Sequence, residues 1–417
     1  MTLNHTQALS TPRRVLYLVS LFPCWSETFI VREIEQLIAA GVDVRILSLK
    51  PPSEAMVQAR AQALMPRVIQ PQPGLGQAAR ALRELFRQPL ACARVFAASA
   101  RDLWRQPLAL AKTWVGLWRS LAALPELRRF DPEWLHAHWA TYPSTAAWAL
   151  SQLLQRPYSF TSHAHDIFVE DQLLARKLRS AALAVTISEY NVRHLAPWRG
   201  AHAAPLEIVH CGVDLGEIPF QPEGREPRLI ASVGRLDPIK GFDVLLPALQ
   251  ALVQGGVDFH CELIGEGEQR AELEAARERL DLEGRLALPG ARPQEQVRSL
   301  LGRAAIFVMP SVRTPSGNQD GIPVALMEAM ASGCAVVSTA VSGIPELVRD
   351  GETGLLVPPG DPQALADALT RLLLDPALRL RLATAARAAV EREFDAAREG
   401  RRLLDAITRR RAELAHA

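Results

Sequence analysis

The sequence has few cysteines, no long apolar run and almost no net charge. No apolar run reaches the roughly 18 residues that a membrane-spanning helix needs. Lys and Arg (47) nearly balance Asp and Glu (45), so nothing indicates nucleic acid as a partner. The cysteines are odd in number and form no Cys-x-x-Cys pair, which argues against a disulfide framework and favours structural thiols in a reducing cytoplasm. They are Cys24, Cys92, Cys211, Cys261 and Cys334.

Short β-branched runs alternate with helical stretches along most of the chain. Residues 15–20 and 44–49 are predicted strands, and residues 28–40 between them a predicted helix. The first run also resembles a short signal peptide, but no small-x-small cleavage site follows it, so we favour a buried strand. The alternation indicates an α/β fold with a doubly wound parallel sheet. Further strands are predicted at 134–136, 158–162, 184–187, 229–233, 261–264, 305–309, 335–338 and 354–357.

The alternation of predicted strands and helices is interrupted between residues 55 and 130. Twelve basic residues stand there against three acidic ones, and aromatic residues are interleaved among them. Such basic amphipathic helices can lie on anionic lipid, at the inner surface of the cytoplasmic membrane. The alternative is a helical layer whose aromatic side chains face the core and whose arginines are solvated. Periodicity alone does not separate the two interpretations.

Prolines and glycines at 219–227 indicate a linker between two domains. We therefore predict an N-terminal Rossmann-like domain (1–217) with a basic helical insertion (about 55–130), a linker (218–227) and a second domain (228–396). Two long helices, 361–374 and 376–410, are predicted near the C-terminus. Two facing α/β domains imply a ligand cleft between them.

Three groups of residues suggest chemistry. In residues 232–241 a strand turns at Gly234 into a helix start, and Arg235 and Lys240 beside helix amides would suit a diphosphate. In residues 320–330, Asp320 precedes a predicted helix from about 324 to 332, and Glu328 lies within it. One carboxylate could reach a sugar hydroxyl and the other a ribose diol, while the amides between them would face phosphates.

The third group consists of histidines that follow two predicted strands. His136 and His138 follow the first, and His163, His165 and Asp166 follow the second. Polar recognition of a reacting centre is one interpretation, and a structural hydrogen-bonding role is the other. A third interpretation is a zinc site, because histidine and aspartate are zinc ligands. No further Cys/His cluster supports it, so we expect no metal.

A dinucleotide fingerprint begins at Gly265-Glu266-Gly267 but is not completed. Arg270 stands where the third glycine belongs, and acidic residues occupy the phosphate loop. We therefore reject NAD binding.

Taken together, these motifs resemble the family-4 retaining glycosyltransferases of the GT-B fold. The second domain carries most of the resemblance, in the segments 232–241, 263–267, 320–328, 343–346 and 354–358. The first domain is similar to the branch that acts in exopolysaccharide and colanic-acid-type biosynthesis, in the segments 22–30, 160–166, 187–189 and 210–214. Asp320 departs from the family pattern, which has Glu there, and Pro323 removes one backbone donor. No family motif matches residues 55–130.

The resemblance implies roles for these residues. Arg235 and Lys240 would hold the diphosphate of a UDP- or GDP-sugar, Glu328 its ribose, and Asp320 with the Gly321 and Ile322 amides the sugar. His163 matches the histidine near the transferred sugar, so it is preferred over His138 and His165. No cofactor is implied beyond the nucleotide sugar as co-substrate, and the acceptor would be a glycan or a lipid-linked glycan. The resemblance also implies that residues 397–417 cross back to the first domain. The wider candidate donor set adds Gly234, Gly290, Arg292 and Val324, and the candidate acceptor contacts are Ser26, Glu27, His138, His165 and Asp166.

Other functions remain open at this point. An epimerase of the same fold would release a free sugar nucleotide without any acceptor. A non-catalytic nucleotide-sugar-binding partner is suggested only by Asp320 in place of Glu.

Overall fold

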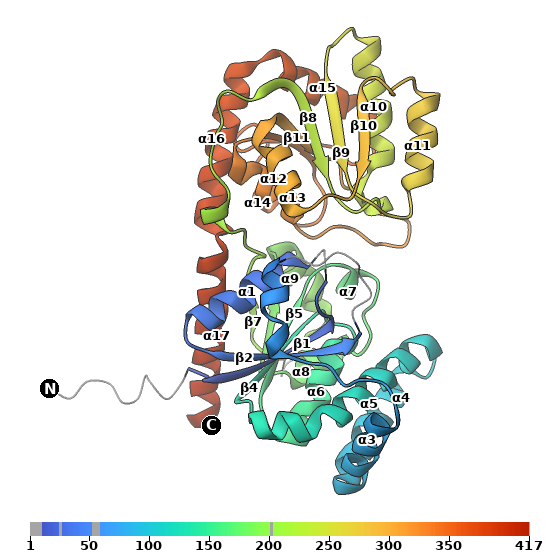
Figure 1. Cartoon of the computed structure of the whole chain (residues 1–417), viewed down its shortest axis with the longest axis vertical. Coiled ribbons are helices and arrows are strands. Elements are labelled where there is room, and N and C mark those ends of the chain that lie inside the picture. The colour runs from blue at the N-terminus through green and yellow to red at the C-terminus, as the bar shows by residue number, and fades with distance from the viewer. Residues whose placement is uncertain (1–10, 25–26, 52–58, 201–202, 417) are drawn as a thin grey trace, which may run out of the picture. The chain divides into compact units, whose positions relative to one another are not determined.

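The computed structural model describes residues 11–24, 27–51, 59–200 and 203–416 (Figure 1). The chain forms two compact units. Unit 1 contains residues 1–187, 191–209 and 397–417, and unit 2 contains 188–190 and 210–396. Unit 2 therefore includes the predicted linker 218–227. Each unit is described by itself.

Unit 1 is built on a seven-stranded sheet of order β3-β2-β1-β4-β5-β6-β7, in which all neighbours are parallel. Val15, Tyr17 and Val19 of β1 are fully buried on one face, and Leu16 and Leu18 on the other. A strand buried on both faces is typical of a parallel sheet covered by helices on each side. The strands are β1 (Arg14–Leu21), β2 (Asp43–Lys50), β3 (Val68–Ile69), β4 (Trp134–His138), β5 (Tyr158–Ser162), β6 (Leu183–Thr186) and β7 (Leu206–Ile208).

Helices flank this sheet, and three of them replace the usual single crossover between β3 and β4. These are α3 (Leu75–Arg87), α4 (Pro89–Leu103) and α5 (Pro107–Phe130), and together they form the segment that we call the helical arm (residues 75–130). Figure 1 shows α3 and α4 lying outside the sheet of unit 1. The other helices of this part of the chain are α1 (Thr28–Ala39), α2 (Ala59–Ala63), η1 (Met65–Arg67), α6 (Tyr142–Leu154), α7 (His165–Phe168), α8 (Leu174–Ser180), α9 (Glu189–Leu195) and η2 (Ala196–Trp198).

Helix α17 (Ala396–His416) belongs to unit 1 although it ends the chain. Leu403 and Ile407 are fully buried in the same apolar cluster as Val15 and Tyr17. Arg410 Nε donates to Ala182 O at 2.8 Å. Full burial of a side chain the size of leucine contributes about 1.5–3 kcal/mol, so this helix is an integral part of the first fold.

Unit 2 is built on a six-stranded parallel sheet of order β10-β9-β8-β11-β12-β13. Its strands are β8 (Glu226–Val233), β9 (His260–Ile264), β10 (Leu286–Gly290), β11 (Ala304–Met309), β12 (Ala335–Thr339) and β13 (Leu355–Val357). The predicted doubly wound α/β class is confirmed. The helices are η3 (Leu215–Glu217), η4 (Pro238–Lys240), α10 (Phe242–Gln254), α11 (Arg270–Arg279), α12 (Gln294–Arg303), α13 (Val324–Ser332), α14 (Ile344–Leu347), α15 (Pro362–Leu374) and α16 (Pro376–Glu393).

The prediction of one helix over 376–410 is wrong, because α16 ends at Glu393 and α17 begins at Ala396. Between them Asp395 forms a parallel bridge with Val213. Val213 N donates to Phe394 O at 2.9 Å, and Ala396 N donates to Val213 O at 3.0 Å. These bonds use backbone groups that a continuous helix would need for its own ladder.

The described helices contain no segment long and apolar enough to cross a membrane.

Candidate functional site

The carboxyl ends of β8 and β11 in unit 2 bring together Lys240 and Asp320. Lys240 Nζ donates to Asp320 Oδ1 at 2.8 Å, and Ser311 Oγ donates to Oδ2 at 2.7 Å. The side chains of Lys240 and Asp320 are only 16% and 11% exposed. The pair is therefore held in a fixed geometry, with limited screening by water.

The turn after β8 is shaped so that Lys240 reaches Asp320. Asp237 caps the short helix η4, since its carboxylate accepts from Ile239 N at 3.2 Å. Gly241 follows with a φ of +69°, and a Cβ there would lie 2.0 Å from Pro310 O. Only glycine fits this backbone without displacing the segment after β11.

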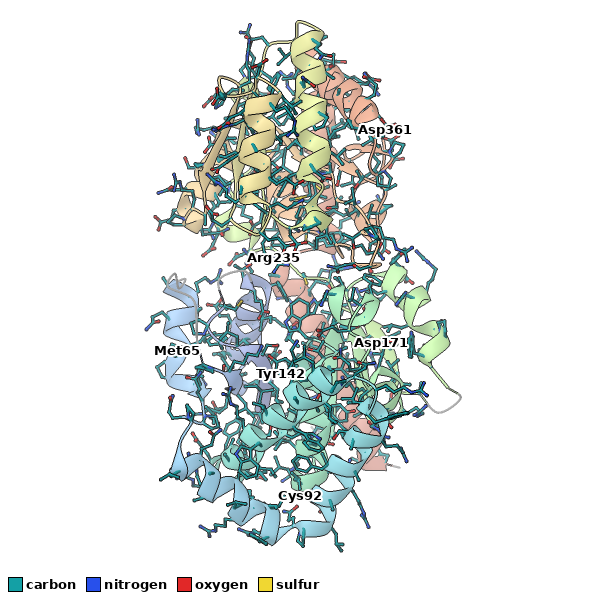
Figure 2. All side chains as sticks on the ribbon, turned by 90° about the vertical axis from the view of Figure 1, so that its right-hand side faces the viewer. Met65, Cys92, Tyr142, Asp171, Arg235 and Asp361 are labelled. Atoms are coloured by element: carbon teal, nitrogen blue, oxygen red, sulfur yellow. The ribbon has the colours of Figure 1, made fainter. Side chains whose placement is uncertain are left out.

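Arg235 does not join the Lys240–Asp320 pair. Its side chain is 65% exposed and donates to Asp237 Oδ2 at 2.9 Å. Figure 2 labels it on the loop that follows β8. Gly234 lies beside Phe242 and Met309 at the start of the same loop. Arg235 is thus a solvated cation on the same loop as the half-buried Lys240, and its exposed guanidinium is accessible to an anion.

Glu328 lies within α13 and is 7% exposed. Both of its carboxylate oxygens lie 3.4 Å from Gln294 Nε2, which makes long, weak hydrogen bonds. The predicted start and end of this helix are confirmed, and Val324 is its first residue. Asp320, Gly321 and Ile322 are buried in the loop that leads into it. Gly290 ends β10, and Arg292 follows two residues later and is half-buried. Both lie at the carboxyl ends of the strands, as Gly234 does.

In unit 1 a hydrogen-bonded chain runs from β1 to the end of β5. Tyr17 OH donates to Glu33 Oε1 at 2.7 Å, and His138 Nε2 lies 2.9 Å from the same oxygen. His138 Nδ1 lies 3.1 Å from His163 Nε2. His138 and His163 are buried, with their ring centroids 5.4 Å apart.

Burial and mutual charge determine the ionisation of this chain. Burial raises the pKa of Glu33, but the charges and hydrogen bonds of His138, His136 and Tyr17 outweigh it and lower that pKa to about 2. Burial lowers the pKa of His163 well below its ordinary value, and His138 adds to the effect. The chain therefore combines an ionised carboxylate with a neutral His163.

The neighbouring polar residues are tied into the backbone. Asp166 is buried and accepts from Ala140 N (2.6 Å), Ala164 N (2.8 Å) and His163 N (3.0 Å). Lys177 Nζ donates to the carbonyl oxygens of Ala140 (2.5 Å), Thr141 (2.8 Å) and Gln172 (2.7 Å). Burial lowers the pKa of Lys177 to about 7, although nearby acidic residues oppose this. Asp166 thus holds the loop that carries His163, which is a structural role.

The other residues of unit 1 that were predicted to contact the acceptor do not form one cluster in the structure. His165 is exposed, at the start of α7. Glu27 Oε1 accepts from Trp139 Nε1 at 3.0 Å, and Trp139 packs on His163 with ring centroids 4.5 Å apart. Ser26 lies outside the described residues. Glu27 therefore reaches His163 through one aromatic ring.

Glu33, His136 and His138 are of metal-ligand type, and their ligand atoms lie within 4.8 Å of one another. His136 Nδ1 lies 2.7 Å from Ser159 Oγ, and its Nε2 lies 3.1 Å from Thr161 Oγ1. The carboxylate oxygen of Glu33 sits at the centre of the group, where it accepts hydrogen bonds. A metal would have to displace this network, so the residues fit a hydrogen-bonded cluster better than a metal centre.

Sequence reasoning missed Glu33, Tyr17, Ser311 and Gln294. A signal for Glu33 was present, because it falls at helical spacing with Ile30, Ile34 and Leu37, which are all buried. An acid on the apolar face of a helix needs a buried partner.

Two family profiles match adjoining parts of the chain. The profile described as Glycosyltransferase Family 4 matches residues 26–217, and the one described as Glycosyl transferases group 1 matches residues 217–389. Together they extend over both units.

Curated relatives match parts of the chain. An amylovoran biosynthesis glycosyltransferase of Erwinia amylovora is 40% identical over 47% of this chain and 49% of its own length. A colanic acid biosynthesis glycosyltransferase of Escherichia coli is 40% identical over 41% of this chain and 42% of its own length. The chain thus spans about half the length of the curated relatives it matches.

Solved structures with the same fold align along almost the whole chain. The Anabaena protein HepE, solved with UDP and glucose, is 18% identical with a TM-score of 0.67, and the match covers 95% of this chain and 99% of that one. A sucrose-phosphate synthase of Thermosynechococcus elongatus is 21% identical with a TM-score of 0.67, over 97% and 98% of the two chains. The two Rossmann-like sheets are those of the GT-B fold, and the chain belongs to the family 4, group 1 glycosyltransferases.

Proposed function

We propose that this protein transfers a hexose from a UDP- or GDP-sugar to a lipid-linked or growing bacterial polysaccharide. The pair formed by the half-buried Lys240 and the buried Asp320, at the carboxyl end of the unit 2 sheet, carries this proposal. HepE, which shares the fold, was solved with UDP and glucose, and the relatives of similar sequence are named for amylovoran and colanic acid biosynthesis. The reaction would take place in the cytoplasm, at the inner face of the cytoplasmic membrane.

The unit 2 residues suit a nucleotide-sugar donor. A lysine ammonium has three N–H donors, and the bond to Asp320 uses one, so two remain for a diphosphate. Arg235 would supply the second cation. Glu328 would accept from the ribose hydroxyls, and Asp320 with the Gly321 and Ile322 amides would position the sugar. Gly234, Gly290, Arg292 and Val324 would shape the surrounding donor pocket.

The chemical step breaks the anomeric C–O bond, and negative charge grows on the leaving diphosphate. Cations fixed in advance at that position stabilise this charge most effectively. Lys240 and Arg235 would do so without a metal ion. We propose retention of the anomeric configuration by front-face attack, in which the departing phosphate takes the acceptor proton. Trapping of a covalent glycosyl–enzyme adduct would contradict this step.

His163 is the unit 1 residue proposed to contact the transferred sugar. Because Glu33 accepts from His138 Nε2, a neutral His138 presents the lone pair of Nδ1 to His163. His163 then carries its proton on Nε2, and its Nδ1 becomes an acceptor. Glu33 is thus a positioning residue that sets the tautomers of both rings.

The test is a thermal-shift screen with UDP- and GDP-sugars, followed by a transfer assay with a membrane extract as the acceptor source. The expected result is stabilisation by one donor and acceptor-dependent loss of that donor. Release of a free isomerised sugar nucleotide without acceptor would instead indicate an epimerase. Binding without turnover for any donor would indicate a non-catalytic partner.

A further inference from the structure

The helical arm exposes an unusual share of apolar side chains. Of the fourteen large hydrophobic residues exposed in the described chain, eight belong to residues 75–130. Contiguous exposed apolar surface on a protein marks an interaction site. The eight are Leu75 (92% exposed), Leu82 (44%), Phe86 (75%), Leu90 (74%), Trp104 (68%), Leu108 (69%), Trp114 (42%) and Val115 (53%).

Helix α3 leaves one apolar stripe exposed, although Ala81 and Leu85 pack inward. Leu75, Leu82 and Phe86 are spaced by seven and four residues, which places them on one stripe of the helix. The side that packs inward contains Gln77, Ala81 and Glu84, and Glu84 Oε2 pairs with Arg128 Nη1 of α5 at 2.5 Å. A surface helix normally buries its apolar stripe, so the exposed stripe of α3 calls for a partner outside the chain.

Exposed arginines lie on α3 and elsewhere on the helical arm. Arg80, Arg83 and Arg87 are exposed on α3, and Arg94 is exposed on α4. Arg105 is exposed at the turn after α4, with its guanidinium 4.7 Å from the ring centroid of Trp104. Within the described part of the chain none of the five has an ion-pair partner. Uncompensated cations beside an apolar stripe match an anionic, partly apolar surface.

We propose that the helical arm docks on an anionic phospholipid bilayer. Leu75, Leu82, Phe86 and Trp104 would enter the boundary between headgroups and acyl chains, and the arginines would bind lipid phosphates. Membranes of this kind attract basic segments within a Debye length of the surface. The amphipathic stripe would supply the apolar part of the affinity and the arginines the charged part.

Charge favours lipid over a second copy of the chain as the occupant of this face. The helical arm carries ten basic and three acidic residues, and two of the three acids are already paired, Glu84 with Arg128 and Asp102 with Arg176. Two such faces would repel each other, because like charges would meet without acids to compensate them. A lipid surface supplies the missing negative charge.

The first test is co-sedimentation of the full-length protein with vesicles of phosphatidylcholine alone or mixed equally with phosphatidylglycerol. The wild type is expected to bind the mixed vesicles and to dissociate at high salt. The triple variant Leu82→Ser, Phe86→Ser, Trp104→Ser should bind at least about tenfold more weakly. Leu374→Ser, at a position of unit 2 that is 71% exposed, should bind like the wild type.

The second test changes charge and leaves the apolar stripe intact. Replacing Arg80, Arg83 and Arg87 by Gln should weaken binding to the mixed vesicles by at least about tenfold. The matched control removes the same charge elsewhere, by Gln at the exposed residues Arg179, Arg193 and Arg279, and should bind like the wild type. Thermal melting checks that all variants are folded.

The proposal is overturned if the wild type prefers neither vesicle, or if both arm variants bind as the wild type does. A concentration-dependent dimer that the serine variant abolishes, without vesicle binding, would assign the face to a second copy and also overturn it. The inference rests on the proposed function only in that a lipid-linked acceptor lies in such a membrane. No donor or acceptor enters the vesicle assay, so either idea can fail alone.

Discussion

Among single residues, Lys240 has the proposed role that is simplest to isolate. Lys240→Ala removes an ammonium held 2.8 Å from Asp320 Oδ1 and leaves that carboxylate without its cation. We expect kcat to fall by about a hundredfold to a thousandfold, as for one lost transition-state donor. The measurement is steady-state transfer with the donor found in the screen. Arg279→Ala, an exposed cation of the same unit, is the control, and unchanged kinetics for Lys240→Ala would remove it from the mechanism.

Glu33 is a positioning residue, and its test needs a pH profile. Glu33→Gln removes the charge that stabilises the protonated histidines, so the acid limb of kcat against pH should move to lower pH. We also expect kcat to fall by about tenfold or more, because the tautomers of His138 and His163 are no longer fixed. Glu35→Gln makes the same change two positions along α1, where the partner is Arg60, and should leave the profile unchanged. A fall in kcat with an unshifted profile would contradict the positioning role.

The two halves of the candidate site differ in how well the sequence predicted them. The segment from Gly234 to Lys240 is local, so the strand, turn and helix start could be recognised from neighbouring residues. Glu33 reaches His138 across about a hundred residues of sequence, and its position depends on how α1 packs on the sheet. A single helical acid looks solvated until that packing is known.

At the scale of elements, the turn between η4 and α10 depends on Gly241. Gly241→Ala should destabilise unit 2 by more than about 2 kcal/mol, since a positive φ costs about 1–2 kcal/mol and the Cβ would also meet Pro310 O. Gly256→Ala is the matched control, with a φ of +67° and no atom within 4 Å of the new Cβ. Urea unfolding of both variants separates the contact from the strain. Equal losses would show that the approach to Pro310 is relieved at no cost.

Element boundaries followed the sequence where local signals exist and departed from it where a distant segment intervenes. Asp361 and Asp375 each cap a helix with Pro at its first position, which is a local sequence signal, and both side chains accept from a backbone N–H at 2.9 Å. The break between α16 and α17 has no such local signal, because it depends on Val213, which is far away in the sequence. Likewise the hydrophobic periodicity of α3 predicts a helix but does not indicate which of its faces is buried.

For the whole molecule, the two units should respond differently to acid. Burial lowers the pKa of His136 to about 3, and the pKa of Glu33 is lowered to about 2. The unfolded chain takes up these protons near pH 6.5 and 4.5, so below those values it binds more protons than the folded one. Each such group costs stability, by about 1.4 kcal/mol per pH unit, while pH falls between its two pKa values. Both groups belong to unit 1.

Tryptophan makes this difference measurable, because all eight tryptophans lie in residues 1–209 and none in residues 210–396. Their fluorescence reports on unit 1, whereas far-ultraviolet circular dichroism reports on both units. Between pH 7 and pH 4 we expect the urea midpoint by fluorescence to fall further than the circular dichroism midpoint. His136→Gln should flatten the fluorescence trend, since it removes one of the groups whose uptake of protons favours the unfolded chain. If the two midpoints fall together at every pH, the units unfold as one, and acid acts on the whole molecule rather than on the buried histidine and carboxylate of unit 1.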